Sequence, residues 1–424
     1  MKEREQTMSK LSRRWILAAG ATGGVAMSMA AAQPQGVFGN PDLPPQGAAN
    51  ATAPAFSDPG PQNPALANNE QPFLDPPATD VGSIQQFWSS FNIAPKRVQA
   101  GGWARQVTTA MFPISTEIAG VNMRLDAGGT RELHWHQQAE WAVMTYGNCR
   151  VTALDAQRRP YVADVKAGDL WYFPAGLPHS LQGLGPDGCE FVICFDNGAA
   201  SEDNTLLLSD WISHTPPKVL AKNFGVSADA FKNIPLQQRW IFQGEVPSSL
   251  AADQQAVASA AGAPPYPFVY RLSDMKPNEA NAGGSIHIAD TSNFHASLTV
   301  ASVMMTIKPG CMREMHWHPN ADEWQYYIQG KARMTVFNTG PNATTAEFMP
   351  GDIGYVPKSL GHYVENIGDN DVILMSVFRT SHYEEVSLSD WLAHTPPAMV
   401  AQTLNLHPAA IAKFPKNSPG IVPA

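Results

Sequence analysis

The strongest constraint on the fold of this 424-residue chain is an internal repeat. The string Arg-Glu-(Leu/Met)-His-Trp-His occurs at 131–136 and at 313–318, and each copy is followed by a Glu and then by another His. A second string, Ser-Asp-Trp-x-x-His-Thr-Pro-Pro, occurs at 209–217 and at 389–397. Each copy is long enough to form its own hydrophobic core. We therefore expect two domains of the same fold, both of which kept their histidines.

Each copy has three histidines and a glutamate at spacings that suit a metal ion. Two histidines at i and i+2 of an extended segment point to the same face of the strand. The Glu follows after a tight connection, and the third His comes from a later hairpin. Imidazole and carboxylate ligands suit Mn, Fe, Ni, Cu or Zn, whereas no Cys falls at the spacing of a thiolate zinc or iron–sulfur site. The predicted ligands are His134, His136, Glu140 and His179 in the first set, and His316, His318, Glu323 and His362 in the second.

The segments between these motifs are typical of an all-β protein. Short stretches rich in Val, Ile and aromatic residues, such as 170–173 and 191–195, alternate with turns that contain Gly and Pro. This pattern favours an antiparallel sandwich or barrel. Helical patterning occurs mainly after each barrel, at 206–212, 227–232, 388–392 and 408–413. We predict two tandem jelly-roll β-barrels with short helical appendages, which would suit contacts in a homo-oligomer.

The N-terminal region is expected to precede the folded domains. Residues 1–32 carry Arg13-Arg14 before a weakly apolar run rich in Gly and Ala, which is the pattern of a twin-arginine signal peptide. This predicts export to the periplasm or the extracellular space, without a membrane anchor. Residues 33–80 are rich in Pro, Ala and Asn and are predicted to be a linker or extension with little regular structure. The first domain is then expected at 81–247 and the second at 248–424.

Charge and cysteine content narrow the possible partners. The net charge is −9 and charged residues make up only 15% of the chain, with no basic stripe. We therefore expect no nucleic-acid partner. A negatively charged protein does not attract anions at long range, so an anionic substrate would need local positive charge. The four cysteines leave two alternatives open, disulfides or buried free thiols.

The ligand motifs resemble those of the cupin superfamily, including the flanking glycines. The second motif departs twice, because Gly183 stands where Asn is usual and Ser359 replaces the inner Gly, but neither change removes a ligand. From about residue 71 to beyond 401, the chain is similar to the microbial oxalate decarboxylases, which have two cupin domains. This resemblance implies a homo-oligomer with manganese in both sites, two per chain. It also implies dioxygen as a cofactor that is not consumed overall, and conversion of oxalate to formate and carbon dioxide.

An arginine precedes each His-x-His pair by three residues. A guanidinium fork beside a metal ion is suited to a small carboxylate, so Arg131 and Arg313 are predicted to bind substrate, and Arg131 also to act in catalysis. The alternative is that these arginines form structural salt bridges with Glu132 and Glu314.

The resemblance also suggests the proton donor. The polar segment 201–205 resembles the active-site lid of the family, whose Glu takes up and returns a proton, so Glu202 is the expected catalytic acid. The alternative is an acidic residue on a solvated loop. In the second half, Ser376 stands fourteen residues after the last ligand His, where the family carries a Glu. A hydroxyl is a poor substitute for a carboxylic acid. We expect the first site to perform most decarboxylation and the second to be structural or to support electron transfer.

Three other functions compete with this interpretation. An oxalate oxidase would use the same ligands and substrate but would produce carbon dioxide and hydrogen peroxide. A seed-storage-like protein with two cupin domains would not be an enzyme, but such proteins usually lose ligands, and both sets are intact here. An iron-dependent cupin dioxygenase or isomerase would act on another small acid. The similarity over the full length, rather than the ligands, argues against this last function.

Overall fold

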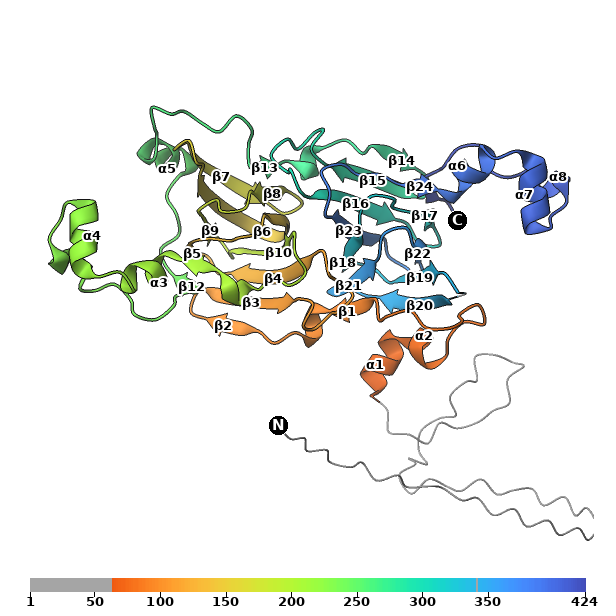
Figure 1. The fold of residues 1–424 in the computed structure, drawn as a ribbon, viewed down its shortest axis with the longest axis horizontal. Helices are drawn as coiled ribbons and strands as arrows, with labels where there is room; N and C mark the ends of the chain where they lie inside the picture. The colour runs from red at the N-terminus through yellow and green to blue at the C-terminus, as the bar shows by residue number, and fades with distance from the viewer. Residues whose placement is uncertain (1–62, 341) are drawn as a thin grey trace, which may run out of the picture. The chain divides into compact units, whose positions relative to one another are not determined.

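The computed structural model of this chain describes residues 63–340 and 342–424 (Figure 1). The predicted signal peptide and most of the predicted linker lie outside these residues. Strands dominate the described part and helices are short, so the prediction of an all-β fold with helical appendages is confirmed.

The first barrel is built from antiparallel strands. The long strand β6 connects its two sides, because its first half pairs with β8 and β10 and its second half with β7 and β9. Gly147 lies at the midpoint with a φ of 68°, and a Cβ there would lie 2.0 Å from Gly188 O, so only glycine fits this bend. The strands of this half are β2 (Arg97–Gln99), β3 (Gly102–Val107), β4 (Ala119–Leu125), β5 (Gly129–Trp135), β6 (Glu140–Leu154), β7 (Pro160–Lys166), β8 (Leu170–Phe173), β9 (His179–Gly183), β10 (Cys189–Phe195), β11 (Leu206–Leu207) and β12 (Ile241–Gln243).

The second barrel repeats this pattern as two sheets. The strand that corresponds to β6 is here divided into β18 and β19, and Gly330 separates them with a φ of 84°. The sheet orders are β1 (Trp88–Ser90)-β21-β18-β23-β16-β15-β14 and β20-β19-β22-β17-β24. Its strands are β14 (Glu279–Asn281), β15 (Gly284–Ala289), β16 (Ala301–Ile307), β17 (Met312–Trp317), β18 (Glu323–Gln329), β19 (Ala332–Asn338), β20 (Asn342–Phe348), β21 (Asp352–Val356), β22 (Gly361–Asn366), β23 (Val372–Phe378), β24 (Val386–Ser387) and β25 (Ile421–Val422).

Each half of the chain contributes a strand to the sheet of the other half. Strand β1 (Trp88–Ser90) precedes the first barrel in sequence but pairs with β21 of the second barrel. Strand β13 (Val269–Tyr270) precedes the second barrel but pairs with β8 of the first. Buried apolar residues of both halves form one continuous core. Strand pairing therefore joins the two barrels, which follow one another in sequence.

The second repeated string forms a helix and its end. In both copies the His ring contacts the backbone carbonyl of the Asp four residues earlier, with His214 Nδ1 2.8 Å from Asp210 O and His394 Nδ1 2.7 Å from Asp390 O. The predicted helix at 206–212 begins at Leu208, because Leu206–Leu207 pair with β5 as a strand. The segment at 227–232 contains a 3-10 helix, η3 (Ala228–Phe231). The helices after the barrels are α3 (Leu208–Ser213), α4 (Pro217–Phe224), α5 (Leu250–Ala256), α6 (Leu388–Ala393), α7 (Pro397–Leu404) and α8 (Pro408–Ile411).

The described end of the predicted linker is more regular than expected. Helices α1 (Pro64–Asn69) and α2 (Gln71–Leu74) lie where little regular structure was predicted. The reason is local, since the Asn63 side chain accepts hydrogen bonds from the backbone N–H groups of Ala65 and Leu66 and so caps α1. Glu70, between the two helices, is buried and its carboxylate accepts a hydrogen bond from Glu347 N of β20.

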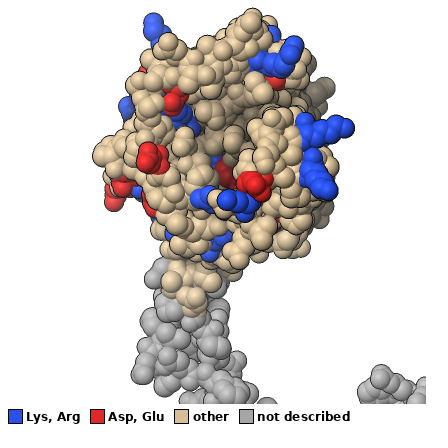
Figure 2. Space-filling model, turned by 90° about the vertical axis from the view of Figure 1, so that its left-hand side faces the viewer, with Lys and Arg blue, Asp and Glu red and all other residues tan. Residues whose placement is uncertain are grey.

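The surface charge, the helices and the cysteines of the described part bear on possible partners. On the face drawn in Figure 2, basic and acidic side chains are scattered among other residues. Within the described part of the chain, no helix has the length and apolar character required to cross a membrane. All four cysteines lie in this part. They are buried free thiols rather than disulfides.

Candidate metal centres

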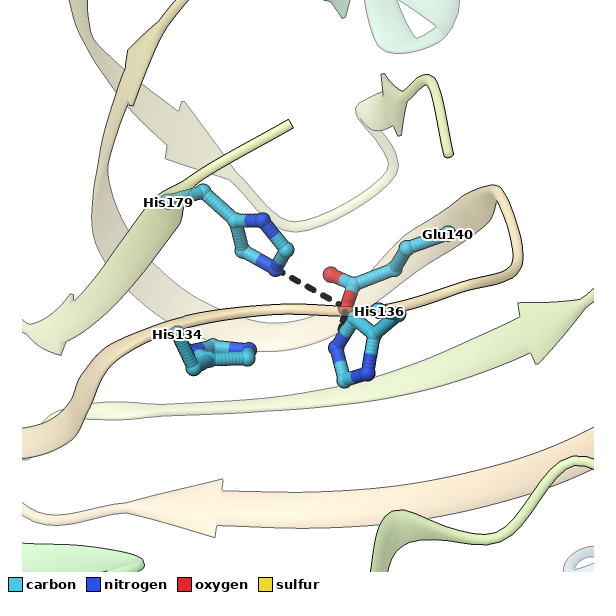
Figure 3. A group of neighbouring side chains, drawn as sticks. All are labelled: His134, His136, Glu140 and His179. Atoms are coloured by element: carbon cyan, nitrogen blue, oxygen red, sulfur yellow. Dashed lines mark hydrogen bonds and ion pairs between the residues drawn. The ribbon is translucent and has the colours of Figure 1, made fainter. Parts of the chain in front are cut away.

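The eight predicted ligands form two clusters, one in each barrel. In each cluster the candidate ligand atoms all lie within 4.8 Å of one another, and all eight residues are buried. Figure 3 shows the first cluster, in which three imidazoles and the Glu140 carboxylate converge on a common point. The structure therefore brings together both sets as the spacing predicted.

Strand pairing places these ligands. His134 is the last residue but one of β5 and lies directly opposite His179, the first residue of β9, while Glu140 is the first residue of β6. In the second barrel, His316 of β17 lies opposite His362 of β22 in the same way, and Glu323 opens β18. A residue far away in sequence thus becomes the cross-strand neighbour of the first histidine.

Backbone carbonyls orient most of the histidine rings. In the first centre, Nδ1 of His134 lies 2.5 Å from Glu132 O, and Nδ1 of His179 lies 2.8 Å from Leu177 O. The corresponding atoms of His316 and His362 contact Glu314 O and Leu360 O at 2.7 and 3.1 Å. A proton held on Nδ1 by a carbonyl leaves Nε2 available as the metal ligand.

Different side chains hold the ligand glutamates of the two centres. Trp171 Nε1 donates a hydrogen bond of 2.8 Å to Glu140 Oε1. At the second centre, Ser376 Oγ donates a hydrogen bond of 2.6 Å to Glu323 Oε1. Ser376, which departs from the family pattern, therefore orients Glu323 in the second centre as Trp171 orients Glu140 in the first.

The charge state of both clusters fits a divalent cation. Burial, reinforced by neighbouring positive charge, holds the pKa values of His134 and His316 well below the ordinary value, so these rings are neutral and able to coordinate. Burial opposes the charge of Glu140, but His179 and His136 hold the pKa of its carboxyl below the usual range. Nε2 of His136, His318 and His362 is buried and forms no well-directed hydrogen bond among the described residues, although it lies 3.2, 3.3 and 2.8 Å from the ligand Glu of the same cluster. A metal ion would satisfy these atoms.

Arg131 and Glu202 meet beside the first centre. Arg131 is 1% exposed, and its Nε lies 2.8 Å from Glu202 Oε1. Its Nη1 donates to Trp240 O at 3.2 Å, whereas its Nη2 is buried without a partner in the part of the chain that the structure describes. Glu202 is 2% exposed, so the alternative of an acid on a solvated loop is wrong. Thr205 connects this turn to a ligand, since its Oγ1 donates to Glu202 O and lies 3.4 Å from His136 Nδ1.

Arg313 at the second centre is engaged on both Nη atoms. Its Nη1 donates to Gly420 O at 2.6 Å, and its Nη2 contacts Tyr383 OH at 3.4 Å and forms an ion pair with Glu385. Burial opposes the charge of Arg313, but Tyr383 and Glu385 hold its pKa above the usual range.

The alternative that Arg131 and Arg313 pair with Glu132 and Glu314 is wrong. Both carboxylates accept hydrogen bonds from serines instead: Glu132 from Ser209 N and Oγ of α3 at 2.7 Å each, and Glu314 from Ser387 Oγ of β24 and from Ser418 Oγ. A strand residue next in sequence points to the opposite face, so the neighbouring Glu cannot reach the arginine's site.

Sequence reasoning missed the residues that complete the surroundings of the two arginines. These are Arg97 and Gln106 near Glu202, and Tyr383 with Glu385 at the second centre. A signal was present for Glu385, because both Glu202 and Glu385 lie in a polar segment between the last long strand of a barrel and the repeated Ser-Asp-Trp string. No comparable signal marks Arg97, which lies on the short strand β2.

Comparisons with known proteins agree with this architecture. The Cupin family profile matches residues 90–231 and 270–412. The chain is 50% identical over 333 residues to Oxalate decarboxylase OxdC of Bacillus subtilis (strain 168), which covers 78% of this chain and 86% of that protein. It is 35% identical over 349 residues to a Probable oxalate decarboxylase of Arthroderma benhamiae, covering 82% and 85% of the two chains. A solved structure of Bacillus subtilis oxalate decarboxylase, described for its Mn(II) centres, superposes with a TM-score of 0.85 at 45% identity and covers 88% of this chain and 97% of that one.

Proposed function

Because this chain belongs to the cupin family, and within it to the oxalate decarboxylases, we propose that it cleaves oxalate mainly at its first metal centre. Manganese in both centres and dioxygen as a cofactor belong to the same proposal. Three imidazoles and a carboxylate per centre suit manganese, and the solved relative is described for its Mn(II) centres.

The observation that carries the assignment to the first centre is the difference between the two arginines. Arg131 keeps a buried Nη2 donor without a partner among the described residues, beside a buried acid. Arg313 has both Nη atoms engaged by Gly420, Tyr383 and Glu385. A buried donor without a partner is costly, and a substrate carboxylate would satisfy it. Only the first centre therefore offers an arginine ready for oxalate.

The residues of the first centre supply the steps around bond cleavage. Bound manganese would supply electrostatic attraction for oxalate and redox chemistry with dioxygen. Arg131 binds one substrate carboxylate, and Glu202 as a carboxylate accepts the proton of the other carboxyl group. The carbon–carbon bond then breaks, carbon dioxide leaves, and Glu202 returns the proton to the remaining carbon to form the C–H bond of formate. In sum, hydrogen oxalate gives formate and carbon dioxide, with the proton conserved.

The enclosure of the site favours protonation. Phe173 packs against His179 and Phe195 against His136, with ring centroids 4.4 and 4.7 Å apart. These apolar walls limit solvent access, so the carbon left after cleavage meets the proton of Glu202 rather than bulk water.

The test is an oxalate assay on the manganese-loaded protein in which formate and hydrogen peroxide are quantified together. We expect close to one formate per oxalate and little peroxide. Peroxide without formate would identify an oxalate oxidase and would remove Glu202 from its role. Neither product would exclude oxalate as the substrate.

We also propose that the chain is exported and forms a homo-oligomer. Trp211 and Trp391 on the helical appendages are 64% and 56% exposed, and Phe337 is 56% exposed, which suits burial against further copies. Light scattering after size-exclusion chromatography tests the oligomer, and a monomer would contradict it. Cell fractionation tests export, which rests on the sequence of residues 1–32, and an unprocessed cytoplasmic product would contradict it.

A further inference from the structure

Glu202 is held by more than its ion pair with Arg131. It begins the 3-10 helix η2 (Glu202–Asn204), and this turn is attached to strands β2 and β3. Arg97 of β2 contacts two consecutive carboxylates of the turn. Its Nη2 lies 3.2 Å from Glu202 Oε1 and its Nη1 lies 2.6 Å from Asp203 Oδ1. A single guanidinium fork thus binds both acids of the turn.

Gln106 of β3 completes this attachment. Its Nε2 donates to Asp203 Oδ2 at 3.0 Å, and its Oε1 accepts from Glu202 N at 2.8 Å and from Ser201 Oγ at 3.2 Å. Both carboxylate oxygens of Asp203 are therefore engaged by the barrel, although Asp203 is 62% exposed. The contacts hold the turn by its outer side, away from the metal ligands.

Arg97 and Arg131 share one oxygen of Glu202. Glu202 Oε1 lies 2.8 Å from Arg131 Nε and 3.2 Å from Arg97 Nη2. Both guanidinium groups also lie over the ring of Trp240, at 4.4 Å for Arg97 and 5.5 Å for Arg131. A substrate carboxylate on Nη2 of Arg131 would share the charge of the guanidinium that pairs with Glu202 through Nε. Arg97 is the second positive group in contact with the Glu202 carboxylate, and it has no part in binding the substrate.

A cavity of about 360 Å³ lies on the outer side of the turn. Arg97, Arg105, Gln106 and Asp203 line it together with Glu202. Glu202 therefore borders this cavity, while Thr205, at the end of the same turn, reaches the ligand His136.

We propose that Arg97 is a positioning residue that holds Glu202 against the first centre during turnover. This inference rests on the proposed function for its effect on products. By holding Glu202, Arg97 raises the fraction of turnovers that end in formate rather than in peroxide. Loss of the contact frees the turn, removes the acid from the cleaved substrate and admits solvent and oxygen.

The first readout is independent of activity. We would measure amide hydrogen exchange of residues 201–205 by mass spectrometry, in the metal-free and in the manganese-loaded protein. In Arg97→Met we expect exchange to rise by roughly tenfold or more, because hydrogen bonds between charged groups are lost. Asp203→Asn removes charge but keeps an acceptor, so we expect a smaller rise. Arg97→Lys is expected to be intermediate, because an ammonium lacks the fork that binds two carboxylates.

The second readout is the ratio of peroxide to formate. We expect this ratio to rise several-fold in Arg97→Met and to rise less in Arg97→Lys. In both variants, kcat for formate release should change more than KM for oxalate. The matched control is Arg124→Met. Arg124 pairs with the 67% exposed Asp187 at 3.0 Å and lies 5.2 Å from the Tyr146 ring, and among the described residues it forms no hydrogen bond or ion pair with the turn at 201–205. Neither readout should change in this control.

Two results would overturn the proposal. One is unchanged exchange at 201–205 in Arg97→Met, which would show that Arg97 does not hold the turn. The other is faster exchange with an unchanged product ratio, which would reduce Arg97 to a structural role. Failure of the proposed function is distinct from both, since the parent protein would then release no formate from oxalate while the exchange comparison would still decide whether Arg97 holds the turn.

Discussion

The two buried arginines should respond differently to the same substitution. Arg131→Lys and Arg313→Lys both keep the charge but lose the fork. At the first centre the lost donor is Nη2, which has no partner among the described residues and which we assign to substrate. A hydrogen bond between charged groups contributes about 1.5–3 kcal/mol, so kcat/KM for oxalate should fall by about 10- to 100-fold.

At the second centre the same change removes contacts within the protein. Arg313→Lys loses donors to Gly420 O and Tyr383 OH, and a buried group without its partner costs about 1–3 kcal/mol. We expect a lower unfolding temperature and a kcat/KM within about threefold of the parent value, because both Nη atoms of Arg313 are engaged within the protein. A change of about threefold is well below the effect of one lost hydrogen bond to the substrate. Steady-state kinetics and thermal unfolding of both variants decide the matter. Equal losses of kcat/KM would refute the assignment of substrate binding to Arg131.

Three further predictions follow from the surroundings of the clusters. Ser376→Ala should weaken metal binding at the second centre by about 10- to 100-fold, and Trp171→Phe should do the same at the first centre. Metal titration of each variant measures this effect. Unchanged affinity would mean that these hydrogen bonds do not orient the ligands. Because the pKa values of His134 and His316 lie below 6.5 in the folded chain, the unfolded chain binds more protons below that pH. The metal-free protein should therefore be fully stable above pH 6.5 and lose up to about 1.4 kcal/mol per histidine for each pH unit below it, whereas denaturant unfolding that is independent of pH would contradict this. Burial raises the pKa of Glu70 to about 9, so its contribution to stability is present below pH 4.5 and is lost as the pH rises to 9. Glu70→Gln should be more stable than the parent at pH 8 and equal to it at pH 4.5, and a variant that is less stable at pH 8 would refute the reasoning.

The repeated motifs made the fold and the ligands predictable. A strand places residues i and i+2 on one face, and for that reason His134 and His136 could be assigned to a cluster without a structure. The fourth ligand followed because the strings around His179 and His362 recur together with the rest of the set. The strand exchange through β1 and β13 was not predictable, because two- and three-residue strands carry no periodicity that identifies their partner.

The partners of the arginines depended on contacts over long sequence distances. Glu132 was the nearest acid in sequence to Arg131, but it lies on the opposite face of β5 and binds Ser209. The sequence has Ser376 where the family carries a Glu, but Glu385 reaches Arg313 from another segment. Side chains that converge from separate loops are set by the packing of the whole barrel, which the local pattern does not contain.

The most direct test of the central claim is the rate of formate release by Glu202→Gln with both metal centres loaded. The substitution keeps the shape of the side chain but removes its ability to accept and return a proton. We predict that formate release falls by about 10²- to 10⁴-fold while metal content stays at two per chain, because that is the range of general acid–base catalysis. Formate release at the rate of the parent protein would contradict the account and would move the chemistry to the second centre.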